Sequence, residues 1–170
     1  MAGDDALLPE QRARARIDDQ LARAGWAVVK RKQDLNLFAG RGVALYEKVM
    51  APGHGEADYI LYVDRKVVGV IEAKKEGTPL AGVEWQSAMY ASGLPEADRQ
   101  RAELIQSRLP FVFEANGVET YFTNGYDPDP RSRSVFNFPK PETLARIVED
   151  FHRNPPWPTW RAAVQLMPPL

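Results

Sequence analysis

Two carboxylates and a lysine stand near one another in a short apolar part of the chain, GEADYILYVDRKVVGVIEAKK. Asp58 and Glu72 are fourteen residues apart and are placed symmetrically about Arg65. If this segment folds as an antiparallel hairpin centred on Arg65, the two acids face each other with Cβ atoms about 5 Å apart. Lys74 follows Glu72 by two residues and therefore shares its face of the strand. The pattern predicts two carboxylates and one ammonium group at the end of a buried sheet.

Such a cluster favours the binding of a hard divalent cation. Like charges opposite each other destabilise a sheet and buried unpaired charges are costly, so a cation between Asp58 and Glu72 would remove the conflict. The chain contains no cysteine, and ligands that are all oxygen favour Mg²⁺ or Mn²⁺ over zinc. The alternative is that Asp58 caps a strand while Glu72 and Lys74 form surface ion pairs.

Two predicted helices direct further polar groups toward this cluster. In a helix over residues 9–24, Glu10 lies on the same face as the apolar residues and is a candidate third metal ligand. Alternatively, Glu10 is a first-turn acid that stabilises the helix N-terminus. Gln86 and Tyr90 are spaced i, i+4 in a helix predicted over residues 79–92. They either reach the site or form the edge of an amphipathic face.

The remaining apolar patterns indicate the elements that position these residues. The runs YILYV and VVGVI are almost unbroken, so both strands of the hairpin should be buried on both faces. Further strands are predicted over residues 26–29, 44–50, 110–114 and 119–123. One further helix is predicted over residues 141–152 and another in the second half of the segment 95–110, and residues 124–134 are predicted to be a loop. We therefore expect an α/β domain with a central mixed β-sheet flanked by helices over residues 1–153, followed by a Pro-rich linker over residues 154–170.

Composition narrows the class of protein. Apolar residues make up 44% of the 170 residues, and no apolar run is long enough to span a membrane or to form a secretory signal. A cytoplasmic location is the natural expectation. The formal net charge is −1, whereas proteins that bind DNA unaided are often strongly basic.

The motifs in their order resemble a known nuclease family. Asp58, the apolar hairpin, Glu72-Ala73-Lys74 and the later segment QSAMY resemble the PD-(D/E)xK nuclease superfamily, in its members that carry a QxxxY motif. The successive segments ADYILY, VIEAKK, TPLAGVEWQSAMYA and PFVFEANG are similar to the N-terminal nuclease domain of the R (restriction) subunit of type I restriction-modification enzymes. The resemblance covers roughly residues 9–152, with Ala57 where the superfamily name has proline.

This resemblance implies a restriction-endonuclease-like fold and Mg²⁺-dependent endonucleolytic cleavage of DNA, as in a type I site-specific deoxyribonuclease. Asp58, Glu72 and the backbone carbonyl of Ala73 would hold Mg²⁺, for which Mn²⁺ can substitute, and Glu10 would be a further ligand. The metal would polarise the scissile phosphate, while Lys74 would orient the attacking water and offset charge on the phosphoryl group. Gln86 and Tyr90, in the helix predicted over residues 79–92, would contact backbone phosphate or support Lys74.

The resemblance also implies partners. Double-stranded DNA would be the substrate, and methyltransferase and specificity subunits would complete the restriction-modification complex. ATP would serve only a helicase-like motor that is not in this chain, because the sequence has no Gly-Lys pair and hence no P-loop. Two alternatives stay open, namely a stand-alone PD-(D/E)xK repair or DNA-end-processing nuclease, and a non-catalytic DNA-binding or subunit-docking module.

Overall fold

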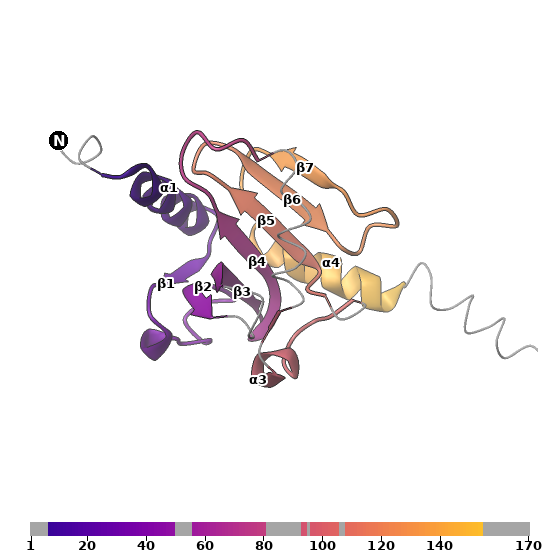
Figure 1. The fold of residues 1–170 in the computed structure, drawn as a ribbon. Coiled ribbons are helices and arrows are strands. Elements are labelled where there is room, and N and C mark those ends of the chain that lie inside the picture. The colour runs from indigo at the N-terminus through magenta and orange to yellow at the C-terminus, as the bar shows by residue number, and fades with distance from the viewer. Residues whose placement is uncertain (1–6, 50–55, 81–92, 95, 106–107, 155–170) are drawn as a thin grey trace, which may run out of the picture.

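A mixed sheet with helices packed against it forms the centre of the protein (Figure 1). The computed structural model describes residues 7–49, 56–80, 93–94, 96–105 and 108–154. The elements, in chain order, are α1 (Pro9–Arg23), β1 (Ala27–Val29), the 3-10 helix η1 (Lys32–Asp34), β2 (Gly42–Val49), β3 (Glu56–Val63), β4 (Lys66–Ala73), α3 (Glu96–Arg99), β5 (Phe111–Ala115), β6 (Thr120–Asn124), β7 (Ser132–Val135) and α4 (Pro141–Arg153).

The seven strands lie in the sheet in the order in which they occur in the chain. β1 pairs with β2, and β4 with β5, in parallel, whereas all other neighbours are antiparallel. A parallel pair needs a long crossover, and residues 74–110 supply it between β4 and β5. The predicted α/β fold with a mixed sheet is confirmed.

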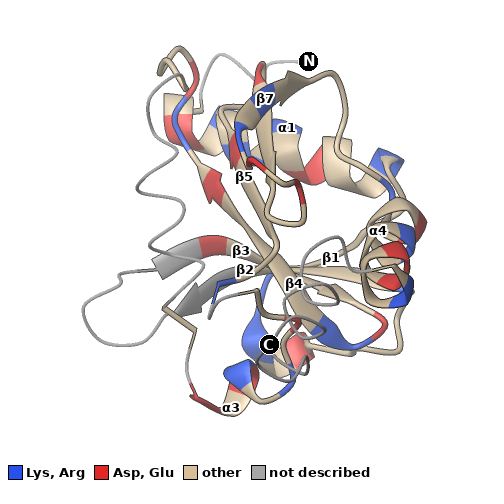
Figure 2. Cartoon of the chain, turned by 90° about the vertical axis from the view of Figure 1, so that its right-hand side faces the viewer, with Lys and Arg blue, Asp and Glu red and all other residues tan. Residues whose placement is uncertain are grey.

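The two long helices share one face of the sheet. α1 buries Ala13, Ile17 and Leu21, which recur at helical spacing, and α4 buries Leu144 and Ala145. These side chains pack on one set of strand residues, while a second apolar cluster, which includes Leu94 and Leu109, covers the opposite face. Because both faces are covered, the central strands are apolar throughout. On the solvent side of α1 and α4, acidic and basic residues are interspersed (Figure 2).

The turn between β3 and β4 is tighter than the sequence suggested. Asp64 and Arg65 both have positive φ, at 49° and 70°, and Val63 pairs directly with Lys66. This is the two-residue hairpin connection that matches the twist of the strands. Lys66 therefore belongs to β4. The turn is centred between Asp64 and Arg65, and not on Arg65 as the sequence predicted.

A β-bulge restores the alignment farther from the turn. Tyr62 pairs with Val67, but the next pair is Leu61 with Gly69, so Val68 is the extra residue. Gly69 is required there, because a Cβ atom at this position would lie 2.4 Å from the carbonyl oxygen of Phe111.

The crossover differs from its prediction. Helix α3 occupies the first half of the segment 95–110, and the helix predicted in its second half is wrong. There, Ala102 forms a bridge with Val67, whose carbonyl accepts the Glu103 N–H at 2.9 Å. Pairing with the bulged strand thus replaces helical bonds. The predicted loop over 124–134 is shorter than expected, because β7 begins at Ser132.

Two predicted segments cannot be compared with the fold. The helix over residues 79–92 falls mostly outside the described residues, as does the linker over 154–170 apart from Asn154. Within the described part of the chain, no helix is long and apolar enough to cross a membrane.

Candidate active site

The hairpin brings the two predicted carboxylates to the same place. Tyr59 pairs with Ile71, so the register continued by one residue sets Asp58 opposite Glu72. Asp58 also reaches across the hairpin, where its Oδ2 accepts the Ala73 N–H at 2.8 Å. Glu72 is only 4% exposed. Both acids thus lie at the end of the apolar strands, as the sequence predicted.

Burial dominates the electrostatics of Asp58. Loss of solvent raises the pKa of its carboxyl group, although the Ala73 N–H and the positive charge of Arg14 act in the opposite direction. The neighbouring charge of Glu72 raises this pKa further, while Lys74 lowers it. The net upward direction means that the ionised form is not fully compensated by the protein. A bound cation would stabilise it.

Lys74 contributes its charge directly to the pair of acids. Its Nζ lies 2.5 Å from Oε1 of Glu72, and the lysine side chain is 24% exposed against 5% for the glutamate. The backbone of Lys74 is fixed as well, because its N–H donates to the carbonyl of Ala115 in β5 at 2.7 Å. The ammonium group therefore stands at the border between the buried acids and solvent.

A buried asparagine holds the loop that follows β4. The Nδ2 of Asn116, a residue that is 3% exposed, donates to the carbonyl of Thr78 at 2.9 Å. Its Oδ1 accepts the N–H groups of Val118 and Glu119 at 2.9 and 2.7 Å. Gly117, with φ +86°, allows the tight turn between β5 and β6. One side chain thus joins that turn to the loop beside the site.

Glu76 connects the same loop to α1. Its Oε1 accepts a hydrogen bond from Nη1 of Arg16 at 3.1 Å, and Nε of Arg12 lies 3.5 Å from Oε2. The Glu76 N–H also donates to the carbonyl of Pro9 at 3.4 Å. The first turns of α1 are therefore attached to the loop that carries Lys74.

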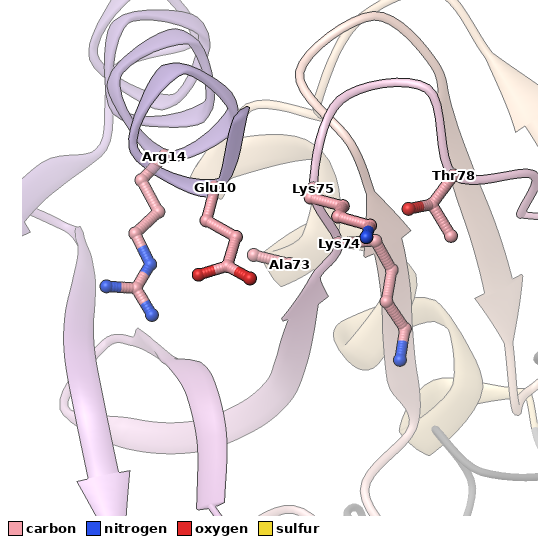
Figure 3. Close-up of a pocket in the computed structure, with 6 residues that line it drawn as sticks. All are labelled: Glu10, Arg14, Ala73, Lys74, Lys75 and Thr78. Atoms are coloured by element: carbon pink, nitrogen blue, oxygen red, sulfur yellow. The ribbon is translucent and has the colours of Figure 1, made fainter. Parts of the chain in front are cut away.

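A pocket of about 470 Å³ opens where α1 meets the end of β4. It is lined by Glu10, Arg14, Ala73, Lys74, Lys75 and Thr78. In Figure 3 the carboxylate of Glu10 extends from α1 toward Ala73, with Arg14 beside it. The pocket is accessible to solvent and carries three basic groups next to the buried carboxylates, which suits an anionic ligand.

The further predicted residues have different outcomes. Glu10 is exposed and lies in the pocket, but within the described ranges no three His, Asp or Glu residues are grouped so as to hold a metal ion. Its role as a ligand stays a prediction. Gln86 and Tyr90 lie outside the described residues.

Sequence reasoning did not single out Glu114. In β5 it is the direct register partner of Glu72 and is 3% exposed. A glutamate at the end of the apolar run PFVFE was a visible signal, but its neighbour across the parallel pair could not be read from local spacing. Arg14 of α1 is likewise close enough to act on Asp58.

The donor set fits a hard divalent cation. Two carboxylates and the adjacent Ala73 carbonyl offer oxygen atoms only, in a setting where burial opposes the charge of Asp58. Mg²⁺ is commonly held by one or two carboxylates, with water and substrate phosphate completing its shell. Asp58, Glu72 and Ala73 could therefore hold the ion, with the anion-accepting pocket beside it.

A family model matches more than half of this chain. The family described as the type I restriction enzyme EcoKI endonuclease subunit second domain matches residues 38–127, which include Asp58, Glu72 and Lys74. No significant match to a curated protein is found.

Two solved structures align with most of this chain. The fragment structure described as a HsdR subunit of a type I restriction enzyme from Vibrio vulnificus YJ016 is similar over 84% of this chain, with a TM-score of 0.58 and 19% identity. The chain spans 25% of that structure. The type IIG restriction endonuclease BpuSI aligns over 88% of this chain and 16% of its own, at 14% identity and a TM-score of 0.44.

Proposed function

Since the chain belongs to the family of the type I restriction enzyme EcoKI endonuclease subunit second domain, we propose that it is a nuclease domain that hydrolyses DNA phosphodiester bonds with Mg²⁺. The observation that carries this proposal is the cluster of Asp58, Glu72 and Lys74 at one end of the β3–β4 hairpin, beside a pocket with basic walls. The family match includes all three residues.

The two acids and the Ala73 carbonyl are the proposed metal ligands. When bound, Mg²⁺ would supply positive charge that polarises the scissile phosphate and stabilises charge as the bond breaks. The Ala73 N–H donates a hydrogen bond to one carboxylate oxygen of Asp58. This bond fixes the orientation of the Asp58 carboxylate relative to β4. Glu10, in the pocket wall, is proposed as a further ligand, directly or through water.

Lys74 is the proposed group for handling the attacking water. Its ammonium group is held beside Glu72 but remains partly exposed to the pocket, so it can donate a hydrogen bond to a water molecule there. It would also offset negative charge that grows on the phosphoryl group. Gln86 and Tyr90 are proposed to contact backbone phosphate or to support this lysine.

The rest of the enzyme is proposed from the family. We infer that the chain acts within a larger R subunit, together with an ATP-driven motor and with methyltransferase and specificity subunits, on double-stranded DNA. The net charge of −1 supports this arrangement, because a domain of this charge gains little affinity from counterion release. Attachment to a DNA-bound motor would raise its effective concentration at the substrate.

Titration calorimetry with Mn²⁺ tests the metal site. We expect millimolar binding by the wild-type chain, its loss in Asp58→Asn and Glu72→Gln, and no change in Glu142→Gln. The control removes one carboxylate from the first turn of α4, an element that lines neither the pocket beside Lys74 nor the end of the hairpin that carries Asp58 and Glu72. Equal affinity in all four proteins would refute the metal site.

Plasmid cleavage tests the chemistry. Mg²⁺-dependent nicking by the chain attached to its motor should disappear in Lys74→Ala, with Mn²⁺ affinity retained. Metal binding without cleavage in any assembly would favour the docking module. Rapid, salt-resistant cleavage by the 170-residue chain alone would favour a stand-alone nuclease.

A further inference from the structure

A second pocket lies against the first and shares Arg14 with it. Its volume is about 220 Å³. From α1 it is lined by Gln11, Arg14 and Asp18, and from the other side by Lys30, Tyr46 and Tyr59. None of these residues except Arg14 also lines the first pocket, so the two form neighbouring compartments along one helix.

The walls of this second pocket are aromatic and its rim is basic. Tyr46 and Tyr59 are register partners on β2 and β3, with ring centroids 5.3 Å apart. The guanidinium carbon of Arg14 lies 4.8 Å from the centre of the Tyr46 ring, a distance at which the two attract each other. This contact holds Arg14 at the border between the two pockets.

The single acid in the pocket is engaged by its neighbours. Oδ1 of Asp18 accepts the Tyr59 hydroxyl at 2.6 Å, and Nζ of Lys30 lies 3.9 Å from Oδ2. The Asp18 side chain is 26% exposed, whereas that of Lys30 is 76% exposed. Lys30 is therefore more accessible than Asp18, and the pocket holds two cations, Arg14 and Lys30, against one acid.

The spacing of the pockets matches neighbouring units of a DNA strand. Along α1, the first pocket takes residues 10 and 14 and the second takes residues 11, 14, 15 and 18, so the second extends four residues further along the helix. Four residues of helix advance about 6 Å, and successive nucleotides of one strand advance about 3.4 Å along a duplex. The second pocket is thus one to two nucleotides from the first.

We propose that the second pocket binds the nucleotide next to the scissile phosphate, with Arg14 and Lys30 binding its phosphate and the Tyr46 ring contacting its sugar and base. This inference rests on the proposed function, because it requires a DNA strand at Asp58 and Lys74. Arg14 then has two neighbours, the metal-site carboxylate Asp58 and the flanking phosphate. Arg14 is therefore the group that aligns the DNA strand with the metal site.

The salt dependence of DNA binding tests this assignment. Each phosphate contact contributes about 0.9 to the slope of log K against log [salt] for duplex DNA. Fluorescence anisotropy with a labelled duplex, in chelator so that no cleavage occurs, should show weaker binding by Lys30→Ala and a slope smaller in magnitude by about 0.9. Lys30→Arg should restore both.

Arg23→Ala is the matched control. Arg23 is an exposed base on the same helix, 3.0 Å from Asp19, and its side chain is 80% exposed. Arg23→Ala removes one positive charge, as Lys30→Ala does, but Arg23 lines neither pocket. The slope of log K against log [salt] for Arg23→Ala should therefore equal that of the wild type. Equal slopes for Lys30→Ala and the wild type, or equal losses in both variants, would overturn the proposed subsite while leaving the nuclease proposal intact. No DNA binding by the wild-type chain even at low salt would count against both, whereas Mn²⁺ binding in the calorimetric test would still support the metal site.

Discussion

Replacing Asn116 with alanine should loosen the loop that carries Thr78. The change removes the donor to the Thr78 carbonyl and the acceptor for the N–H groups of Val118 and Glu119. The loop then keeps its attachment to α1 through Glu76 but loses its attachment to the β5–β6 turn. We therefore expect lower stability together with greater local mobility beside the pocket.

The magnitude follows from the three bonds and their surroundings. A typical hydrogen bond contributes about 0.5–1.5 kcal/mol to the free energy of unfolding. Two of the three donors belong to the exposed residues Val118 and Glu119, where water can replace the lost partner, so the sum should lie near the lower end, at about 2 kcal/mol. For a protein of this size that corresponds to a fall in Tm of about 4–8 °C.

Urea denaturation and amide hydrogen exchange measure the two effects. Exchange at the Thr78 N–H, which donates to the Lys75 carbonyl, should become faster in Asn116→Ala. Val118→Ala serves as the control, because this side chain is 64% exposed in the same turn and its loss should change stability by less than about 0.5 kcal/mol. Equally small losses of stability in both variants, or unchanged exchange at the Thr78 N–H, would contradict the role assigned to Asn116.

Three further predictions concern the sheet, the acid stability and the isolated chain. Gly69→Ala should lower the free energy of unfolding in urea by about 2 kcal/mol or more, because its Cβ would lie 2.4 Å from the Phe111 carbonyl oxygen; a loss within error would contradict the close approach. Burial acts to raise the pKa of Glu103, but hydrogen bonds from His152 and Lys66 lower it overall, so its stabilisation is present at neutral pH and disappears as the pH falls through the folded-state pKa. The stability difference between wild type and Glu103→Gln should thus vanish in acid, and a constant difference would be the contrary result. The isolated chain, with its net charge of −1, should bind duplex DNA weakly in anisotropy titrations at physiological salt, and nanomolar binding would oppose this.

Local patterns were sufficient for most of the secondary structure. The apolar runs around Asp64 predicted the hairpin, and the apolar spacing over residues 9–24 predicted α1. Gly25 and Gly117, both with positive φ, follow α1 and β5. In these cases the signal and the structure lie within the same few residues. The pairing of Asp58 with Glu72 was also predicted, although the turn has two residues and a bulge in β4 supplies the residue that keeps the two acids opposite each other.

Contacts between distant segments were not predictable in this way. The segment after α3 has a helical composition, yet its backbone pairs with Val67, because the bulge presents a carbonyl there that local propensity does not register. Glu114 meets Glu72 only through the parallel pairing of β5 with β4. Asn116 lies between two predicted strands, but its bond to Thr78 depends on where the crossover begins.

The bulge at Val68 sets a parity rule for the spacing of the two acids. In a regular antiparallel hairpin with a two-residue turn, residues that face each other are separated by an odd number of positions. Asp58 and Glu72 are separated by fourteen, so an extra residue must lie in the turn or in a strand, and here it lies in β4. If pairing were regular from the turn onward, Ile71 would face Asp58, and Glu72 and Lys74 would project from the other side of the sheet. An even spacing combined with a two-residue turn should therefore identify a bulged hairpin in relatives of this chain from their sequences alone, whereas an odd spacing should identify a regular one.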